Sequence, residues 1–537
     1  MHKLHPVSVS SMRFWLRWMA WSLPIGTGVV LGVSFPPMGG AGIGIGLIAL
    51  VPLLVRWLEG GLPTRVLHEV ALAGGIAGAV AFGWGVWHPF WPSAAAAVGG
   101  IGLWAFGFAL PWMAGAVWVR RNQLGRAWLV VIGGTLVLEG LWSIGPWALP
   151  WGGLGHTLAS VPVLSSLAAA WGVPGLSLLV LVANAWVAES VYALRVHRSS
   201  GRSRTPHDRR RWAVLLLCVM GLVGHAVWLD RVHSVVSEPP PDAPVLFLVQ
   251  PGHTPTDWAT LDDPKRVRDL QVLTIAALDT ARRFPDMVVW PETAVPPDPS
   301  DTLRTHLQRW VEQHNVPLLT GAIAHVPTAR PYRHANRLTL FQPHATRQTY
   351  DKHHLVPFVE GVPGAEALPF VAHGAVAGGG VAGYQRGPGP TLLSVRRPRS
   401  RDTLRLAPLI CLESVIGPYV QRYMAARRWP EALVVASQTG WWGTPRPARQ
   451  HLAFSRLRTL ETGRPLALVT VAGPTTAVAP DGTVGRRLPW GERGVVAVRL
   501  PSPASRPPYA TQPPGLLPLF GMVALALAWI PCACLRN

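Results

Sequence analysis

Hydrophobic residues follow two different patterns along the chain. Apolar runs of about the length that crosses a bilayer, ~20 residues, lie at 14–34, 41–57, 69–90, 95–119, 127–146, 164–194, 212–229 and 512–534. A long, more polar insert separates the last run from the others. We therefore expect a membrane domain with seven helices over 1–229, a polar domain over 230–511, and an eighth membrane helix within 512–537.

Inside the insert the pattern changes to short apolar strings that alternate with helical stretches. The strings are typical of buried strands: 245–249, 287–290 and 406–410. Between them, 264–283 and 450–462 have the composition of helices. Alternation of this kind predicts an α/β or layered α+β domain.

Composition and charge agree with a membrane protein. The chain is 49% hydrophobic and only 14% charged, and its net charge is +21. Much of the arginine lies in alternate short loops, which the positive-inside rule places in the cytoplasm, so we read the charge as membrane topology and not as a nucleic-acid surface. The first run lacks a clean signal-peptide cleavage site and is expected to be retained. With the N-terminus inside, seven crossings place 230–511 outside.

Two scarce residue types carry information. The only lysines are Lys3, Lys265 and Lys352, although arginine is abundant. Of four cysteines, only Cys411 lies in the polar domain, and no disulfide framework is readable. A lysine or cysteine inside a motif is therefore informative.

Three ionisable residues follow strand-like strings, where α/β folds gather functional groups. They are Glu292 after 287–290, Lys352 after Tyr350-Asp351, and Cys411 after 406–410. A carboxylate can deprotonate a thiol, whose free pKa is ~8.5, and an ammonium can stabilise the oxyanion that forms when the thiolate attacks a carbonyl. Alone, each residue is more often structural; together they predict acyl transfer.

The motifs resemble those of a known family. Trp290-Pro291-Glu292, the stretch 352–358 (Lys-His-His-Leu-Val-Pro-Phe) and Cys411-Leu412-Glu413 resemble the nitrilase superfamily, and within it the membrane-embedded apolipoprotein N-acyltransferase family. Ser34-Phe35-Pro36-Pro37, Leu149-Pro150-Trp151 and the stretch 172–177 (Gly-Val-Pro-Gly-Leu-Ser) are similar to that family's membrane signatures. The resemblance covers nearly the whole chain.

The resemblance implies a fold and a set of site residues. It implies an αββα sandwich on the periplasmic side, with Glu292 as general base, Lys352 as oxyanion stabiliser and Cys411 as nucleophile. Further family positions are matched by residues expected to support catalysis or to bind and admit substrate: Glu360, Glu413, Trp258, Leu412, Trp441 and Trp442.

The sequence departs from the family pattern at two places. Leu412 stands where an aromatic residue commonly follows the cysteine. In the stretch 437–443, Gln438 and Thr439 replace the usual Asn-Asp pair. We expect the second departure to affect substrate positioning more than the chemistry.

As implied by the resemblance, the expected function is transfer of a fatty acyl chain from a membrane phospholipid, through a Cys411 thioester, to the α-amino group of a diacylated apolipoprotein. The expected setting is the bacterial inner membrane, with a monomeric enzyme and no cofactor. Three alternatives remain: a membrane-anchored nitrilase-type amidohydrolase, a multispan channel or transporter, and a non-catalytic scaffold.

Other residues have two readings each. Glu139, within the fifth run, is either functional or a carboxylate facing the helix bundle. His353, His354 and His451 could ligate a metal, but without a paired acid or cysteine spacing we expect packing or hydrogen-bonding roles and no metal. The stretch 358–377 is either a mobile arm that dips toward lipid or an ordered loop.

Overall fold

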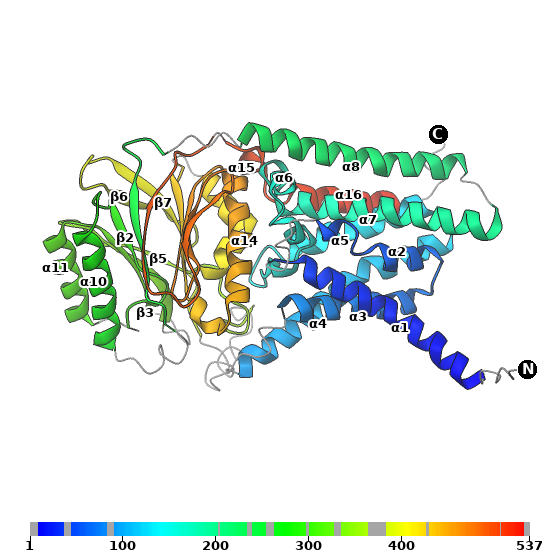
Figure 1. Cartoon of the computed structure of the whole chain (residues 1–537), viewed down its shortest axis with the longest axis horizontal. Coiled ribbons are helices and arrows are strands. Elements are labelled where there is room, and N and C mark those ends of the chain that lie inside the picture. Colours follow the sequence, from blue (N-terminus) through cyan, green and yellow to red (C-terminus); the bar gives the residue numbers. More distant parts are fainter. Residues whose placement is uncertain are drawn as a thin grey trace, which may run out of the picture.

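The structure, a computed structural model, describes residues 9–36, 44–82, 91–201, 205–233, 239–253, 263–296, 300–326, 334–363, 383–425, 429–504 and 506–530. Within these ranges the chain forms a helical part and a strand-rich part, which lie end to end along the long axis (Figure 1). The helical part contains α1 (Val9–Ser34), α2 (Val51–Leu58), α3 (Pro63–Phe82), α4 (Trp91–Arg120), α5 (Leu124–Leu141), α6 (Pro162–Ser165), α7 (Ala168–Ser200), α8 (Pro206–His233) and α16 (Leu516–Trp529).

The expected apolar runs coincide with apolar helices in the described residues. Five helices are long and apolar enough to cross a membrane: Pro63–Phe82, Val98–Arg120, Leu124–Leu141, Ala168–Ser200 and Pro206–Val232. Shorter apolar helices cover Trp21–Ser34, Ile45–Leu58 and Leu516–Trp529. The protein is thus built as a membrane protein, and the count of eight spans remains a prediction.

The second run, 41–57, differs most from its expectation. Its described residues form a 3-10 turn, η1 (Ile45–Leu47), followed by α2 (Val51–Leu58). An eight-residue helix is only ~12 Å long, whereas the hydrocarbon core is ~30 Å thick. Most of α2 is buried against other helices, including α7, so its apolar residues pack within the helix bundle.

Helix α7 contains the clearest backbone irregularity of the helical part. Gly172 has φ 64 and ψ −168, which breaks the helix just before Pro174. A side chain at Gly172 would collide with the ring of Tyr509, so the position requires glycine both for its backbone angles and for space. The expected motif at 172–177 therefore shapes a kink where the helical and strand-rich parts meet.

The strand-rich part is a sandwich of two six-stranded sheets. The first has the order β12-β1-β2-β3-β4-β5 and the second the order β11-β10-β9-β8-β7-β6. The strands are β1 (Val245–Gln250), β2 (Met287–Val289), β3 (Leu318–His325), β4 (His334–Phe341), β5 (Gln348–Asp351), β6 (Leu393–Arg396), β7 (Thr403–Ile410), β8 (Ala432–Ser437), β9 (Leu466–Thr470), β10 (Thr475–Val478), β11 (Val484–Leu488) and β12 (Gly494–Arg499). The expected strings 245–249, 287–290 and 406–410 are confirmed as β1, β2 and β7.

Helices cover both outer faces, which makes the domain an αββα sandwich as expected. Side chains alternate along β1, so Leu246 and Leu248 point into the core between the sheets, whereas Val245 and Phe247 pack outward. On that outward side lie α10 (Asp263–Asp279) and α11 (Asp301–His314). The second sheet is covered by α14 (Pro445–Thr462), drawn orange between the sandwich and the membrane helices in Figure 1.

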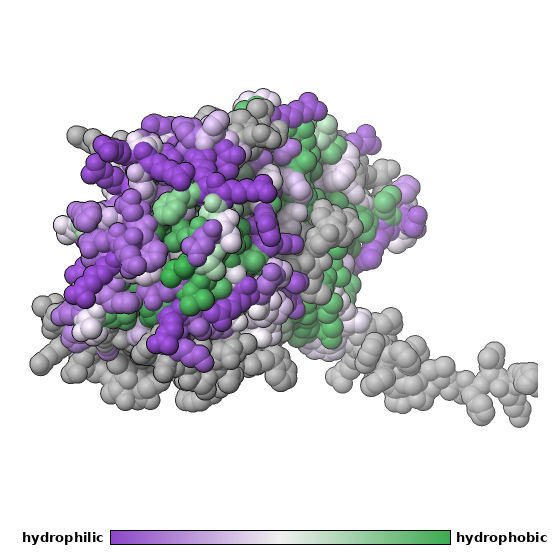
Figure 2. Space-filling model, turned by 60° about the vertical axis from the view of Figure 1, so that its left-hand side comes forward, coloured by the Kyte–Doolittle hydropathy of each residue, from purple (hydrophilic) through white to green (hydrophobic). Residues whose placement is uncertain are grey.

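Helix α14 joins the two parts into one hydrophobic core. A single buried cluster includes Leu433 and Leu468 of the second sheet, Phe454 of α14, and Leu31 and Leu179 of the membrane helices. The surface has the opposite distribution: hydrophilic residues cover most of the sandwich, whereas hydrophobic residues form a band over the helices (Figure 2). The sandwich is therefore seated directly on the membrane part.

Candidate active site

The three strand-end residues converge at one edge of the sandwich. Glu292 follows β2, Lys352 follows β5, and Cys411 follows β7 and begins the 3-10 helix η5 (Cys411–Val415). Cys411 has φ 49, in the left-handed region that non-glycine residues seldom adopt. Strained backbone of this kind is characteristic of functional positions, and it places the thiol at a sharp strand-to-helix turn.

Lys352 is fully buried between two carboxylates. Its Nζ lies 2.8 Å from Glu360 and 3.7 Å from Glu292 Oε1. Burial alone would lower the pKa of Lys352, but the Glu360 and Glu292 carboxylates outweigh burial and raise it above its ordinary value. The side chain therefore stays an ammonium ion, which is the form that can stabilise an oxyanion.

Glu292 is buried and held by two hydrogen bonds. Its Oε1 accepts from Asn336 Nδ2 at 2.6 Å, and its Oε2 accepts from the Gln438 backbone N–H at 2.6 Å. Burial raises the pKa of Glu292, opposed mainly by the Lys352 ammonium. A carboxylate with a raised pKa is a better proton acceptor from a thiol than an ordinary surface glutamate.

Cys411 is partly buried and lies within the electrostatic reach of both groups. Burial, followed by the Glu292 carboxylate, raises the pKa of Cys411 to about 12, while Lys352 and a hydrogen bond with Ser437 act in the opposite direction. The resting thiol is therefore neutral at physiological pH. Its activation requires transfer of the proton to a nearby base.

Glu413 connects the turn at Cys411 to the segment that follows Lys352. Its carboxyl accepts from the backbone N–H groups of Ile410 at 2.8 Å, His353 at 2.7 Å and His354 at 3.1 Å, and from Tyr350 Oη at 2.7 Å. Burial raises its pKa to about 7 against these donors. Glu413 thus joins segments that are about sixty residues apart in sequence.

The structure locates the remaining expected site residues as follows. Leu412 is 2% exposed and belongs to the core cluster around α14, so it packs inward. Trp441 is 46% exposed. Trp442 packs edge-on against Trp151 of the membrane part. Trp258 lies outside the described residues, as does most of the stretch 358–377.

The structure shows which groups Gln438 and Thr439, the two departures from the family pattern, bond. Glu292 is bound by the backbone of Gln438, which any residue except proline supplies. The Gln438 side chain accepts from Gly440 N at 3.1 Å, and Thr439 Oγ1 accepts from Ala472 N at 3.2 Å. The Gln438 amide also donates to Thr293 Oγ1 at 3.4 Å, next to Glu292. Neither side chain bonds any of the three candidate catalytic groups by a hydrogen bond that the structure records.

Helix α14 connects this site to the membrane part. His451 Nε2 lies 2.9 Å from the Cys411 carbonyl oxygen, and its ring stacks on Trp151 at 6.1 Å. Gln450 Nε2 donates to the backbone carbonyls of Pro36 at 2.7 Å and Ala81 at 2.9 Å. These contacts join Pro36 and Trp151, from two of the membrane signatures, to the helix that contacts the Cys411 carbonyl.

Sequence reasoning missed Asn336 and Gln450 and left four other polar residues ambiguous: Glu139, His353, His354 and His451. His353 and His451 are engaged by backbone carbonyls, of Gly387 and Cys411 respectively, and the described residues contain no group of three metal-ligating side chains. Glu139 of α5 accepts from Leu154 N at 2.7 Å and Ser177 Oγ at 2.5 Å. Both of its oxygens are therefore used within the membrane part, away from Cys411.

The sandwich region is similar to known proteins. Residues 250–507 match the carbon-nitrogen hydrolase family. Among solved structures, an amidase from Nesterenkonia sp. is 17% identical, with 55% of this chain and 99% of that chain covered at a TM-score of 0.37.

Curated relatives extend the match into the membrane part, and three of them share the name apolipoprotein N-acyltransferase. The protein from Chlorobaculum tepidum is 29% identical over 52% of this chain, which spans 56% of that relative. The one from Caulobacter vibrioides is 27% identical over 92% of this chain and 91% of its own. The one from Azotobacter vinelandii is 30% identical over 79% of this chain and 77% of its own. Through this similarity over most of its length, the chain belongs to the apolipoprotein N-acyltransferase family.

Proposed function

We propose that this protein transfers a fatty acyl chain from a membrane phospholipid to the α-amino group of the S-diacylglyceryl cysteine of an apolipoprotein. The observation that carries the proposal is the grouping of Glu292, Lys352 and Cys411 in a sandwich that rests on membrane helices through α14. The relatives' shared name supports the choice of substrates.

In the first half-reaction Glu292 takes the proton from the Cys411 thiol while sulfur attacks the ester carbonyl carbon of the phospholipid. The Lys352 ammonium stabilises the oxyanion. Collapse breaks the bond between the carbonyl carbon and the glycerol oxygen, and Glu292 returns the proton to that oxygen. A lysophospholipid leaves, and the acyl chain remains on Cys411 as a thioester.

In the second half-reaction the α-amino group of the acceptor attacks the thioester carbonyl. Lys352 again stabilises the oxyanion, and Glu292 accepts a proton from the attacking amine. The carbon–sulfur bond breaks, the thiolate is reprotonated, and an amide remains on the lipoprotein. In this scheme Glu360 holds Lys352 charged and in place through the 2.8 Å ion pair, and Glu413 holds the turn of Cys411.

We propose the membrane topology that the sequence predicts. Residues 1–229 and 512–537 form the membrane domain with eight spans, and 230–511 form a periplasmic catalytic domain of a monomeric inner-membrane enzyme. Trp441, with its exposed ring, and Trp442 border the route to the thiol, and we assign Trp258 to the substrate entrance, as the resemblance to the family implies. Both substrates keep their acyl chains in the bilayer, so their encounter with the site is a lateral search.

The test is transfer of radiolabel from a phospholipid labelled in its acyl chain to a synthetic diacylated lipopeptide. The full-length protein should label the peptide, whereas Cys411→Ala, Glu292→Gln and Lys352→Met should not. The matched control is Cys218→Ala, because Cys218 is an exposed thiol on α8, far from the site in sequence. Label released as free fatty acid with none on the peptide would support the amidohydrolase alternative. Folded protein that yields neither product would support a scaffold.

A further inference from the structure

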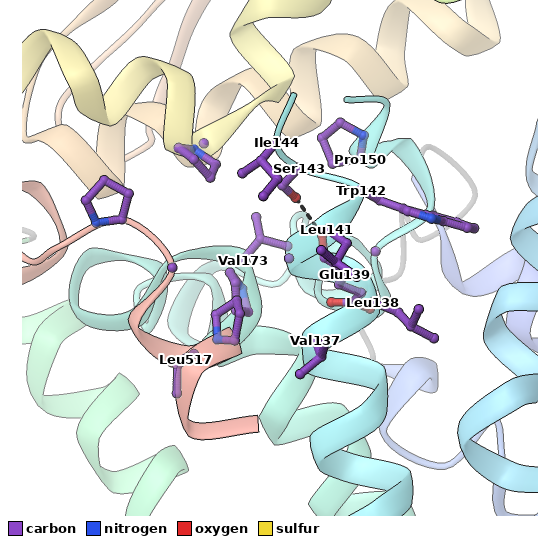
Figure 3. A pocket seen from close by; sticks show the side chains of 18 of the residues that line it. Val137, Leu138, Glu139, Leu141, Trp142, Ser143, Ile144, Pro150, Val173 and Leu517 are labelled. Atoms are coloured by element: carbon purple, nitrogen blue, oxygen red, sulfur yellow. Dashed lines mark hydrogen bonds between the residues drawn. The ribbon is translucent and has the colours of Figure 1, made fainter. Parts of the chain in front are cut away.

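A cavity lies where the sandwich meets the membrane helices. It has a volume of about 300 Å³ and a mainly apolar lining. Its walls come from the end of α5, the kink of α7, the start of α16 and residues 415–418 of the sandwich (Figure 3). Neither Glu292, Lys352 nor Cys411 is among its lining residues, so it is separate from the candidate active site.

One end of this cavity is polar and fully buried. Arg458 and Glu461 of α14 are 0% and 1% exposed and form an ion pair between Nη2 and Oε1 at 2.7 Å. Within the described part of the chain, Arg458 Nε and Glu461 Oε2 have no hydrogen-bond partner. The Val173 amide favours the charged form of Glu461, but Oε2 receives no hydrogen bond of normal geometry.

The unsatisfied Glu461 Oε2 belongs to a set of polar groups that converge beside Gly417. A Cβ atom added to Gly417 would lie 3.0 Å from Arg458 Nη1, 3.2 Å from Glu461 Oε2 and 3.3 Å from Tyr509 Oη. All four residues line the cavity. Leaving a buried polar atom without a partner costs about 1–3 kcal/mol, so this end is well suited to a ligand that supplies both a donor and an acceptor.

The opposite end of the cavity faces the surface of the membrane part. Leu141 and Ile144, just at and beyond the end of α5, are each 53% exposed, and Met522 of α16 is 51% exposed. All three line the cavity. Figure 3 shows Leu141 and Ile144 on the α5 side and Leu517 on the α16 side of the space. These side chains form an apolar mouth, through which an apolar chain can enter from the bilayer alongside the closely packed helices α5 and α16.

We propose that this cavity binds a monoacyl glycerolipid, with its single acyl chain at the end lined by Leu141, Ile144 and Met522 and its free glycerol hydroxyl at the Arg458–Glu461 end. A hydroxyl both donates and accepts hydrogen bonds, which matches a free carboxylate oxygen beside a free guanidinium N–H. The volume is at the small end of the range of ~300–1,000 Å³ for small-molecule sites, which favours one chain over two. A diacyl lipid also lacks the free hydroxyl next to its ester.

The proposed ligand connects to catalysis if the proposed function holds, because lysophospholipid is the product of the first half-reaction. Arg458 Nη1 donates to the Val415 carbonyl at 2.7 Å, and Val415 ends the short helix that begins at Cys411. Glu461 is ten residues beyond His451 on α14, or ~15 Å along the helix. The cavity thus holds the released lipid beside the site without occupying it.

The test uses photolabelling of the full-length Cys411→Ala protein in nanodiscs, so that no acyl transfer is needed. The probe is lysophosphatidylethanolamine with a diazirine in its acyl chain, and the comparison is diacyl phosphatidylethanolamine with the same diazirine chain. Labelled sites are mapped by mass spectrometry. We expect the lysolipid, and not the diacyl lipid, to label peptides that cover 137–144 and 513–522.

Two variants with matched controls test the two ends of the cavity. Leu141→Trp obstructs the mouth, and Leu129→Trp places the same ring on α5 away from the cavity lining. Glu461→Gln removes the free acceptor, and Glu69→Gln neutralises an ion-paired carboxylate elsewhere. Loss of a hydrogen bond to a charged group predicts about tenfold weaker labelling of Glu461→Gln. We expect a similar loss in Leu141→Trp. Both controls should be labelled within about twofold of the parent.

Equal labelling by the diacyl lipid, or labelling unchanged in both Leu141→Trp and Glu461→Gln, would overturn the proposal. If Glu461→Gln fails to fold, the comparison of Leu141→Trp with Leu129→Trp decides. Because binding is measured in a protein without its nucleophile, a failure of the acyltransferase proposal in the transfer assay leaves this result standing, and the reverse also holds.

Discussion

The hydrogen bond from Asn336 to Glu292 gives a sharp test of the candidate base. Asn336 is 2% exposed on β4, and its Nδ2 donates to Glu292 Oε1 at 2.6 Å and toward Glu360 Oε1 at 3.4 Å. This bond favours the charged form of Glu292 and so lowers its pKa. Asn336→Leu keeps the branched shape of the side chain and removes the donor.

The expected size of the effect follows from the bond energy. A hydrogen bond to a charged group is worth about 1.5–3 kcal/mol, and one pKa unit corresponds to about 1.36 kcal/mol. Asn336→Leu should therefore raise the pKa of Glu292 by about one to two units. Since the base must be ionised to accept the thiol proton, the rising limb of kcat/KM against pH should move to higher pH by the same amount. At pH values on the rising limb, where the base is mostly protonated, the rate should fall about ten- to a hundredfold.

The assay is lipopeptide acylation measured from pH 5 to pH 9. Gln342→Leu is the matched control, because Gln342 is a buried amide just beyond the same strand that bonds Ser394 and Arg396 and not Glu292. We expect the control to lose stability without a displaced pH profile. An Asn336→Leu protein that is folded and has the parent pH profile would refute the role of Glu292 as the base.

Three further predictions concern the thiol, the loop beside it and the seat on the membrane part. Because the pKa of Cys411 is raised to about 12, alkylation of the resting thiol by iodoacetamide should still be rising with pH at pH 10; a plateau near pH 8 would contradict the assigned burial. Gln438→Asn should change acylation less than about threefold, since the base is held by the backbone N–H at that position; a hundredfold loss would show that the longer amide is essential. Gln450→Leu removes the donor to the Pro36 and Ala81 carbonyls and should destabilise the protein by about 1–3 kcal/mol, measured as a lower thermal midpoint in detergent; an unchanged midpoint would contradict its role in seating the sandwich.

The secondary-structure elements and the reacting groups could be predicted from the sequence because both leave local patterns in it. Strand β7 reads as an apolar string, and a cysteine directly after it is visible without any knowledge of the fold. The number of spans stays a prediction, because hydropathy does not distinguish lipid-facing from protein-facing residues. In the apolar run at 41–57, for example, most of α2 is buried by neighbouring helices.

The contacts that organise the site are non-local and could not be predicted from the sequence. Asn336 reaches Glu292 across 44 positions, and Gln450 reaches Pro36 across 414. The interpretation of Glu413 as a support for Cys411 came from the family resemblance. The structure adds the physical reason, because the Glu413 carboxyl accepts hydrogen bonds from the backbone N–H groups of both Ile410 and His353.

The most direct test of the account is to detect the acyl-enzyme itself. The purified protein is mixed with a phospholipid of defined acyl chains and no acceptor, and the peptide that contains Cys411 is examined by mass spectrometry. The account predicts one acyl chain on Cys411, sensitive to neutral hydroxylamine and discharged when diacylated lipopeptide is added. An active preparation that transfers acyl chains while Cys411 remains unmodified, or that retains activity as Cys411→Ala, would contradict it.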